Sequence, residues 1–375
     1  PMRVSVIMPT YNRADLLSSS LVSVLEQTHR PWQVIVVDDG SSDQSHNVAA
    51  HLLSEYKYEW PYGRVIRQEK NQGKSVAVNR GLKDADGNLI WIWDDDDLAD
   101  PERLERMVPM FEEDEQLGLV HTWAEWMEPI EGGAQTAQVI EWMPEDTPIK
   151  DVLRANLRGN IFFTISCLWR GEVLDTLAEL EGRGVYDMRE GAIAVVDGAW
   201  PLDPDLERAQ DFDFWMRMSY AMVMGEWTCK LLKEKTVTAR QHRGRRGKGH
   251  RFPFEDVPKE TMKCERLIFQ KLARKIPIPA IFPGYNEREV LRQEAHVELA
   301  YAFAIRGLWD YVYTNLQLVV RPQLLVQRIH RGLVDTLWGA VRSVNGSREV
   351  LKELHRIKQG IPSEMSASDA ANIII

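Results

Sequence analysis

Four consecutive aspartates, Asp94 to Asp97, are the residues of this sequence whose types and spacing most clearly suggest chemistry. They directly follow an apolar run, Leu89 to Trp93, which predicts a buried β-strand. Neighbouring carboxylates raise each other's pKa unless a positive group lies between them. A hard divalent cation is the natural candidate for that group, because oxygen ligands favour Mg²⁺, Mn²⁺ or Ca²⁺.

Side chains alternate along an extended stretch, so Asp94 and Asp96 are expected to converge while Asp95 turns away. A calcium-binding EF-hand is excluded, because apolar residues stand where its loop requires a ligand and a glycine. The alternative to a metal site is a solvated acidic turn that stabilises the start of the helix predicted near Pro101. The position of the cluster after a buried strand favours the metal site.

A magnesium site made only of protein ligands is rare, because Mg²⁺ usually takes one or two carboxylates together with substrate phosphates. The cluster therefore predicts a phosphate-bearing substrate. The sequence has no GxxxxGK[ST] loop and no GxGxxG opening a helix after a strand, which disfavours P-loop ATPases and NAD enzymes. A nucleotide held through its metal ion and its base is the remaining expectation.

The elements that must position these residues alternate along the first half of the chain. Apolar runs predict strands over 3–8, 32–37, 64–68, 88–93 and 117–123, and helical spacing predicts helices over 13–27, 41–56, 73–85 and 101–111. This rhythm indicates an α/β fold, Rossmann-like, with a mostly parallel sheet flanked by helices. Ligands of such sheets bind beyond the carboxyl ends of the strands, so Asp38 and Asp39 should face the same edge as the aspartate cluster.

The second half is less regular. Residues 160–170 predict a core strand, 211–225 a helix, and 230–244 a strand that leads into the basic segment Arg240–Arg251. From about residue 256 the pattern is helical, so we place a catalytic domain at 1–255 and a helical C-terminal region at 256–375. The amphipathic stretch 324–342 has three interpretations: docking on the catalytic domain, pairing with a second copy, or contact with a membrane surface.

Composition narrows the classes of partner and compartment. The formal net charge is −10, which makes the chain a poor candidate for binding nucleic acid. No apolar run is long enough for a transmembrane helix. Cys167, Cys229 and Cys264 fit no zinc spacing, and they favour a reducing compartment. We predict a cytoplasmic protein and leave open contact with the inner face of the membrane.

Five segments occur in an order that resembles the family 2 glycosyltransferases of the GT-A fold: VSVIMPTYNRADLLSSSLVSVLEQT, VVDDGSSD, NQGKSVAVNRG, WDDDDLADPERL and QDFDFWMR. The resemblance covers roughly residues 2–250. It implies an inverting, hexosyltransferase-like enzyme that moves a sugar from a nucleotide-sugar, with a leaning towards UDP, to an acceptor hydroxyl. It also implies Mn²⁺ or Mg²⁺ as cofactor, and a glycan, a lipid-linked molecule or a small molecule as acceptor.

The same resemblance assigns residues to the site. Those expected at the donor nucleotide are Pro9, Tyr11, Asn12, Asp38, Asp39, Asn71, Gly73, Lys74, Asp94 and Asp95. Those expected at the metal are Asp94, Asp96, Asp97 and His242. Those expected at the diphosphate, on a Gly-rich lid, are Arg240, Arg243 and Arg245. The alternatives for the last group are a solvated basic loop and contact with anionic lipid or an anionic acceptor.

Inversion requires a base that removes the proton of the acceptor hydroxyl. In the family this base is the aspartate of a Glu-Asp pair that opens a helix, and here the pair is Gln210-Asp211. We therefore predict Asp211 as the base, although the pair carries one negative charge fewer than in the family because Gln210 is neutral. Asp213 is the competitor, and it is expected to point away from Asp211 on the helix. The alternative role for Asp211 is that of a stabilising carboxylate at a helix N-terminus.

Two further questions stay open at this point. Trp123, Trp126 and Trp142 are candidates for stacking on an acceptor sugar, against the commoner role of core residues. A non-catalytic carbohydrate-binding or scaffold protein that retains the fold is one rival function. A nucleotidyltransferase that makes nucleotide-sugars is another, but the sequence after the first strand lacks the Gly-rich basic loop that it would need.

Overall fold

The computed structural model describes residues 2–58, 62–128, 138–142, 147–157, 160–181, 186–187, 192–193, 201–206, 208–240, 263–270 and 276–304, and residues 306, 308, 311 and 315. The chain packs as two compact units, Pro1–Val257 and Pro258–Ile375. The separate roles expected of a catalytic domain and a C-terminal region stay predictions. Within the described ranges, no helix is both long and apolar enough to cross a membrane.

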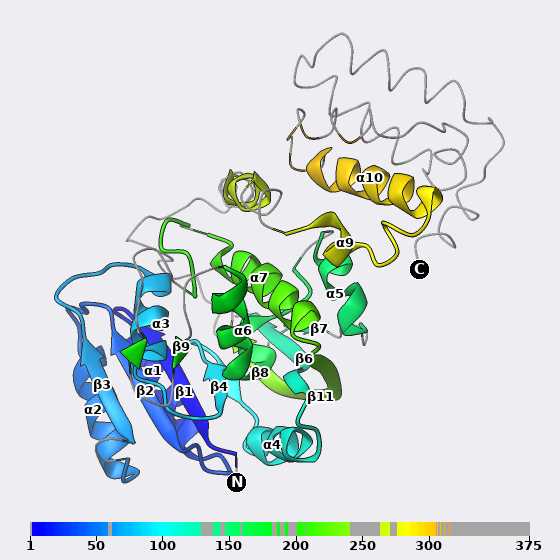
Figure 1. Cartoon of the computed structure of the whole chain (residues 1–375). Helices are drawn as coiled ribbons and strands as arrows, with labels where there is room; N and C mark the ends of the chain where they lie inside the picture. The colour runs from blue at the N-terminus through cyan, green and yellow to red at the C-terminus, as the bar shows by residue number, and fades with distance from the viewer. Residues whose placement is uncertain are drawn as a thin grey trace. The chain divides into compact units, whose positions relative to one another are not determined.

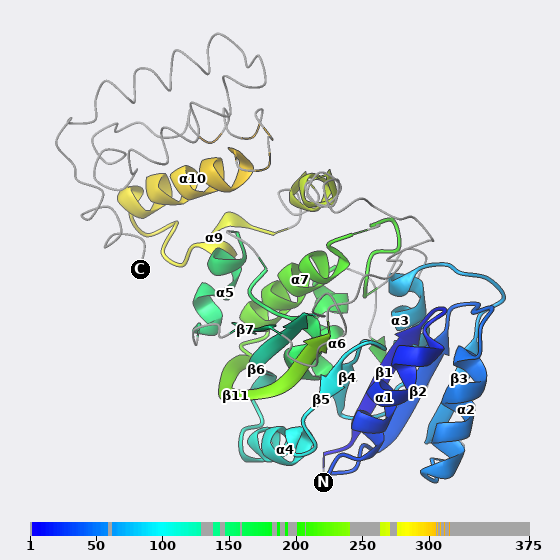
Figure 2. The ribbon, with the colours of Figure 1, turned by 180° about the vertical axis from the view of Figure 1, so that it is seen from behind.

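The first unit is built on one large sheet, which nine strands form within the described residues (Figures 1 and 2). The strands are β1 (Val4–Thr10), β2 (Gln33–Asp38), β3 (Gly63–Arg67), β4 (Leu89–Ile92), β5 (Leu98–Ala99), β6 (Leu117–Glu128), β7 (Gln138–Trp142), β8 (Cys167–Arg170) and β11 (Thr228–Arg240). Their order is β3-β2-β1-β4-β8-β6-β11-β5, and β7 pairs with β6. A separate pair is formed by β9 (Tyr186–Asp187) and β10 (Ala192–Ile193).

Most of these strands run in the same direction. β1 is parallel to β2 and β4, β2 to β3, and β6 to β11, whereas β8 is antiparallel to both β4 and β6. The predicted mostly parallel sheet is therefore confirmed. Because the carboxyl ends of β1, β2, β4, β6 and β11 lie at one edge, the loops after Asp38 and after Ile92 open on that edge.

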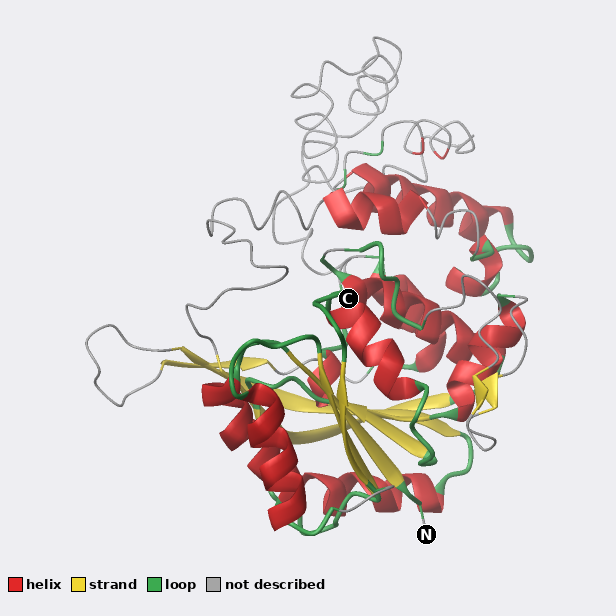
Figure 3. Cartoon of the chain, turned by 90° about the vertical axis from the view of Figure 1, so that its left-hand side faces the viewer, coloured by secondary structure: helices red, strands yellow, loops and turns green. Residues whose placement is uncertain are grey.

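Helices cover both faces of the sheet (Figure 3). One face packs against α1 (Ala14–Leu25), α2 (Ser45–Glu55) and α4 (Arg103–Glu113), and the other against α3 (Lys74–Leu82), α5 (Ile149–Asn156), α6 (Glu172–Leu180) and α7 (Gln210–Met224). The strand side chains alternate between the two cores: Trp91 and Trp93 lie in the first, and Ile90 and Ile92 in the second. Apolar residues at every strand position are what a sheet covered on both faces requires.

Three local predictions differ from the structure. The strand predicted over 160–170 is confined to β8, because the side-chain oxygens of Asn156 and Asn160 accept the backbone N–H groups of Ile161 and Phe162 and thereby take these donors from a strand ladder. The second helix begins at Ser45, four residues later than the start of the predicted range 41–56. The short strand β5 and the helix α6 were not predicted.

The second unit is helical in the residues that can be described. Residues 263–270 form a helix, followed by α9 (Ile278–Ile281) and α10 (Glu289–Ala304). His296 of α10 is buried, with one ring nitrogen 2.8 Å from the Tyr285 hydroxyl and the other 2.9 Å from Asn315 Oδ1. The amphipathic stretch 324–342 lies outside the described residues, so its three interpretations stay open.

Candidate active site

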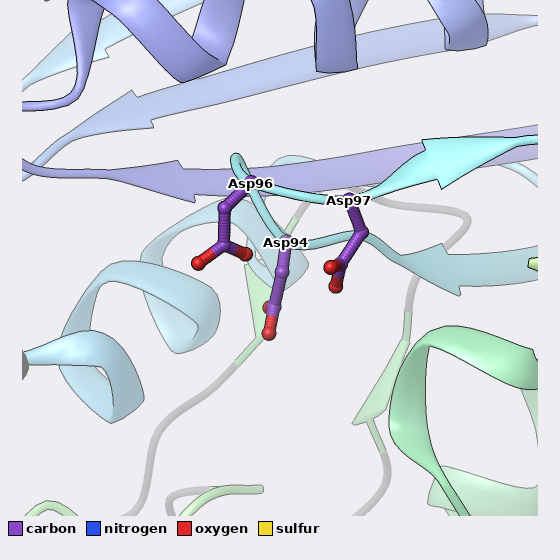
Figure 4. A group of neighbouring side chains, drawn as sticks. All are labelled: Asp94, Asp96 and Asp97. Atoms are coloured by element: carbon purple, nitrogen blue, oxygen red, sulfur yellow. The ribbon is translucent and has the colours of Figure 1, made fainter. Parts of the chain in front are cut away.

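The aspartates follow β4 at the sheet edge where ligands are expected. Asp94, Asp96 and Asp97 each offer one carboxylate oxygen within 4.8 Å of the others, and all three side chains extend to the same side of the turn (Figure 4). Asp95 is not part of this group. Three convergent carboxylates are the oxygen-rich, negatively charged set that a hard divalent cation prefers. The cluster therefore fits Mg²⁺ or Mn²⁺ by its chemistry.

Asp97 is the one residue of the three that is buried, which is unfavourable for a negative charge. This burial, followed by the charges of Asp96 and Asp94, raises the pKa of its carboxyl well above the ordinary value. Its Oδ1 accepts the backbone N–H of Arg240 at 2.9 Å. A cation between the carboxylates would offset the repulsion from Asp96 and Asp94 that adds to this shift.

Basic side chains neutralise the other two carboxylates. Lys74 Nζ lies 2.6 Å from Asp94 Oδ1 and 2.7 Å from Asp94 Oδ2. Arg13 NH1 lies 2.5 Å from Asp96 Oδ2 and 3.9 Å from Asp95 Oδ1. Lys74 was expected in the site, whereas Arg13 was not. Arg13 could have been found from its position at the start of the predicted helix 13–27. A positive charge is unfavourable at a helix N-terminus, so an arginine there suggests an acidic partner elsewhere in the fold.

Asp95 occupies a different environment from its neighbours. It is buried, and this desolvation raises the pKa of its carboxyl to about 7, against the opposing charge of Arg13. The predicted contact of Asp95 with the donor stays a prediction.

Arg240, expected at the diphosphate, is the last residue of β11. Its guanidinium donates to Ser19 Oγ at 2.7 Å, to Leu16 O at 3.1 Å and to the carbonyl of Asp96. Arg240 thereby ties the aspartate turn to α1, a structural task that sequence reasoning did not foresee. Its contact with a diphosphate stays a prediction.

Asp38 ends β2 and Asp39 follows it, and the two carboxylates have different surroundings. Asp38 is fully buried, accepts the N–H of Ser41 at 2.8 Å, and lies 3.5 Å from Arg67 Nε and 3.6 Å from His46 Nδ1. The carboxylate of Asp39 bridges to the loop before α3. It accepts Gln68 Nε2 and the backbone N–H groups of Gln72 and Gly73, all at 2.8 Å. Both aspartates therefore shape the loops that border the site.

The loop before α3 depends on glycine at two positions. Gly73 precedes the helix with a φ of 97°, in the left-handed region that side chains rarely adopt. Gly40 has a φ of 74°, and a Cβ there would meet the backbone of Lys70 and Asn71 at 2.7–2.9 Å. Asn71 thus lies where the loops after β2 and β3 touch, and its Oδ1 is buried without a hydrogen-bond partner.

The end of β1 is fixed by Asn12. This residue has a φ of 51°, and its Oδ1 accepts the backbone N–H of Ser42 at 2.7 Å. Its own N–H donates to Ser41 Oγ at 3.0 Å. Pro9 is buried within β1, opposite Val37 of β2, and Tyr11 follows the strand with partial exposure. Contacts of these residues with a nucleotide stay predictions.

Asp211, the predicted base, lies in the first turn of α7 with its side chain exposed. Although the residue as a whole is exposed, protein atoms around its carboxyl desolvate that group and raise its pKa; the charge of Lys74 and the backbone N–H groups of Phe212 and Asp211 oppose this rise, and the charge of Asp94 adds to it. Asp211 is therefore within electrostatic reach of the aspartate cluster. Its Oδ2 accepts a hydrogen bond from Asn160 Nδ2 at 3.2 Å. Asn160 carried no signal in the sequence, because it lies in a segment that read as a strand.

Asp213 is engaged elsewhere. It is buried, and its Oδ2 accepts Arg217 Nε at 2.9 Å and Arg217 NH2 at 2.6 Å. Arg217 also donates to Pro201 O at 2.6 Å. Asp213 and Arg217, which lie one helical turn apart, therefore form a buried structural ion pair. Because Asp213 is engaged in this pair, Asp211 is the better candidate for contact with a substrate.

Several expected residues cannot be placed. His242, Arg243 and Arg245 lie outside the described residues, and of Trp142 only the backbone is described. Trp123 and Trp126 lie on β6 and are partly buried. The Trp126 ring stacks on Phe163 with centroids 5.8 Å apart, so it contributes to packing. A contact of these tryptophans with a sugar stays a prediction.

Comparison with known proteins adds a family and a fold. Residues 5–167 match the family described as Glycosyl transferase family 2. An uncharacterised glycosyltransferase of Nostoc sp. is 36% identical over 120 residues, which are 32% of this chain and 36% of that protein. Another from Methanocaldococcus jannaschii is 26% identical over 216 residues, which are 57% of this chain and 63% of that protein. The chain thus spans less than two thirds of the length of these relatives.

Among solved structures, that of S. aureus TarS residues 1–349 in complex with UDP-GlcNAc is similar, with a TM-score of 0.53 and 17% identity. The similarity covers 97% of this chain and 94% of that one. At this identity the likeness speaks for the fold, which is the GT-A fold of glycosyltransferases. Together with the ordered motifs and the acidic turn after β4, these findings place the similarity to glycosyl transferase family 2 in residues 5–167.

Proposed function

We propose that this protein is a metal-dependent inverting glycosyltransferase that moves a sugar from a nucleotide-sugar to an acceptor hydroxyl. The observation that carries the proposal is the convergence of Asp94, Asp96 and Asp97 at the ligand edge of the sheet, within electrostatic reach of Asp211. A metal site beside a solvent-exposed carboxylate is the arrangement that a displacement at a sugar carbon needs.

Asp94, Asp96 and Asp97 would hold the divalent ion. A bound Mn²⁺ or Mg²⁺ ion would neutralise the negative charge that develops on the leaving diphosphate. Lys74 adds a second positive charge at the same place, because it already lies against Asp94. Fixed positive groups aimed at a developing charge lower the barrier without any reorganisation at the moment of reaction.

Asp211 would act as the general base. Its carboxylate takes the proton of the acceptor hydroxyl as the hydroxyl oxygen attacks the anomeric carbon of the donor. The bond from that carbon to the diphosphate oxygen breaks, and the nucleoside diphosphate leaves with the electron pair. One in-line displacement inverts the configuration at the anomeric carbon, so the product carries the anomeric configuration opposite to that of the donor.

UDP is the proposed carrier. The motif resemblance leans towards UDP, and the similar TarS structure is described as a complex with UDP-GlcNAc. The loops after β2 and β3, which Asp39 ties together, border the aspartate edge and are the proposed walls of the nucleotide site. The acceptor, contact with a membrane surface and pairing with a second copy stay predictions.

The test is direct. Purified protein is incubated with UDP-GlcNAc, other UDP-sugars and GDP-sugars in Mn²⁺ or in EDTA, and release of nucleoside diphosphate is measured. We expect slow hydrolysis of one donor that requires Mn²⁺ and disappears in Asp211→Asn. The control is Glu115→Gln, which removes one negative charge from an exposed position before β6, at the opposite edge of the sheet.

Each rival function has its own outcome. A non-catalytic binding protein would be stabilised against heat by a nucleotide-sugar and release no product. A nucleotidyltransferase would form nucleotide-sugar and pyrophosphate from UTP and a sugar phosphate. Parental hydrolysis by Asp211→Asn would remove the base assignment.

A further inference from the structure

We propose that Asn160 is a positioning residue for the base: its side-chain amide holds the Asp211 carboxylate in one orientation and in its charged form. This inference rests on the proposed function, because it concerns how Asp211 would take a proton. It assigns a role to a residue that no motif of the family resemblance includes.

The orientation of the Asn160 amide follows from its two contacts. Asn160 Oδ1 accepts the backbone N–H of Phe162 at 3.2 Å, and Nδ2 donates to Asp211 Oδ2 at 3.2 Å. A backbone N–H can only donate, so the oxygen of the amide must face Phe162. The NH₂ group is thereby directed at Asp211, and the amide cannot turn over without losing both bonds.

The loop that carries Asn160 is built onto the helix that carries Asp211. Thr164 Oγ1 accepts Trp215 Nε1 at 3.0 Å, and the Phe162 and Trp215 rings lie with centroids 5.2 Å apart. Asn156 is fully buried, and its Nδ2 donates to Ser219 Oγ at 3.1 Å. These contacts recur along α7, so α5 and the loop that carries Asn160 are held against the helix of the base at several positions.

Donation to Oδ2 has two chemical consequences for Asp211. It restricts rotation of the carboxylate, so the orientation in which the base meets the acceptor hydroxyl is set before a substrate arrives. It also stabilises the charged form of the carboxylate, because a hydrogen bond to an anion favours ionisation. The other charged groups that act on Asp211 are Lys74, which also favours ionisation, and Asp94, which opposes it.

The experiment compares three variants with the parent protein. Asn160→Ala removes the donor, and Asn160→Asp replaces it by a charge of the same sign as the base. Thr164→Val is the matched control: it loosens the same loop from α7 but leaves the Asn160 amide and Asp211 in place. The first measurement is the titration of the Asp211 carboxyl carbon by NMR, with its signal identified by its loss in Asp211→Asn.

We expect Asn160→Ala to raise the pKa of Asp211, Asn160→Asp to raise it further, and Thr164→Val to leave it unchanged. The second measurement is Mn²⁺-dependent hydrolysis of UDP-GlcNAc against pH. We expect the acid limb of the profile to move to higher pH in the same order, and kcat of Asn160→Ala to fall about tenfold, the loss that goes with one hydrogen bond to a charged group. Thermal stabilisation by UDP should stay as in the parent.

The outcomes separate the two proposals. A parental titration of Asp211 in both Asn160 variants overturns the positioning role, whatever the activity. An equal shift in Thr164→Val also overturns it, because loop packing would then be the cause. If the titration shifts as expected but Asp211→Asn hydrolyses donor at the parental rate, Asn160 holds a carboxylate that is not the base, and the base assignment within the proposed function fails instead.

Discussion

Lys74 Nζ lies within 2.7 Å of both carboxylate oxygens of Asp94, one of the three residues proposed to bind the metal. The same charge lowers the pKa of Asp211, the proposed base. Lys74 thus links the metal cluster to the base. Its charge also offsets part of the negative charge of the cluster.

Substitution of Lys74 by methionine should therefore affect metal and nucleotide in opposite directions. The cluster becomes more negative, so Mn²⁺ alone should bind about two- to fivefold more tightly, as expected for a half-exposed ion pair. UDP should bind more weakly, because a cation next to the diphosphate is lost. Calorimetric titration with Mn²⁺ and then with UDP checks both signs. Lys83→Met, on an exposed residue just past the other end of α3, is the control; equal behaviour of the two variants would contradict the prediction.

Asp97→Asn should abolish the stabilisation by UDP that depends on Mn²⁺, while it keeps or raises the melting temperature of the ligand-free protein. The asparagine oxygen can still accept the N–H of Arg240, and a buried charge in conflict with Asp96 and Asp94 is gone. Thermal melts with UDP, in Mn²⁺ and in EDTA, give both values. A ligand-free protein that melts much earlier than the parent would show that Asp97 serves the fold instead.

The pH profile of donor hydrolysis should have an acid limb set by Asp211. A base works only when deprotonated, so the rate falls as the pH drops through the pKa of this carboxyl. Desolvation raises that pKa, and the limb is therefore expected above the ordinary range of an aspartate. Rates measured from acidic to neutral pH, with folding monitored by circular dichroism, check the position. A limb at or below the ordinary aspartate value would argue against a desolvated base.

Asp213→Asn should lower the stability of the fold and keep activity, whereas Asp211→Asn should keep stability and lose activity. It breaks the buried pair with Arg217, and the loss of one partner of such a pair costs about 3–5 kcal/mol of folding free energy. Activity per folded molecule should persist. Urea unfolding and hydrolysis rates, measured on both variants, should give one unstable active protein and one stable inactive protein.

Arg240→Ala should destabilise the fold by about 2 kcal/mol, because its guanidinium holds α1 and a carbonyl of the aspartate turn. Arg106→Ala removes exposed ion pairs with Glu102 and Glu234, and it should cost less than about 1 kcal/mol. Urea unfolding compares the two. An Arg240 variant of parental stability with weakened UDP binding would instead support the diphosphate role.

The parallel sheet, and the edge of it at which the acidic loops open, could be predicted from the sequence. Apolar periodicity and the alternation of strands and helices are enough to determine both. The sequence could not supply β5, whose two residues are too few to produce a periodic signal. The antiparallel direction of β8 was also out of reach, since strand direction depends on partners far away in the chain.

Within the site, residue types pointed to the carboxylates but not to their partners. Arg13 and Asn160 reach Asp96 and Asp211 from segments more than 50 residues distant in sequence. Such contacts are set by tertiary packing and leave no local pattern. Arg240 also has a structural task that its charge did not predict: its guanidinium holds α1, and its contact with a diphosphate stays a prediction.

The junction of β5 and β11 has a practical consequence. Thr238 and Val237 pair with Leu98 and Ala99, and just beyond them the carboxylate of Asp97 takes the Arg240 amide hydrogen. That amide proton therefore acts as a built-in probe of the acidic turn. Its rate of exchange with deuterium, followed during titration with manganese or with a diamagnetic substitute, would report ligand arrival without any label, antibody or enzymatic assay.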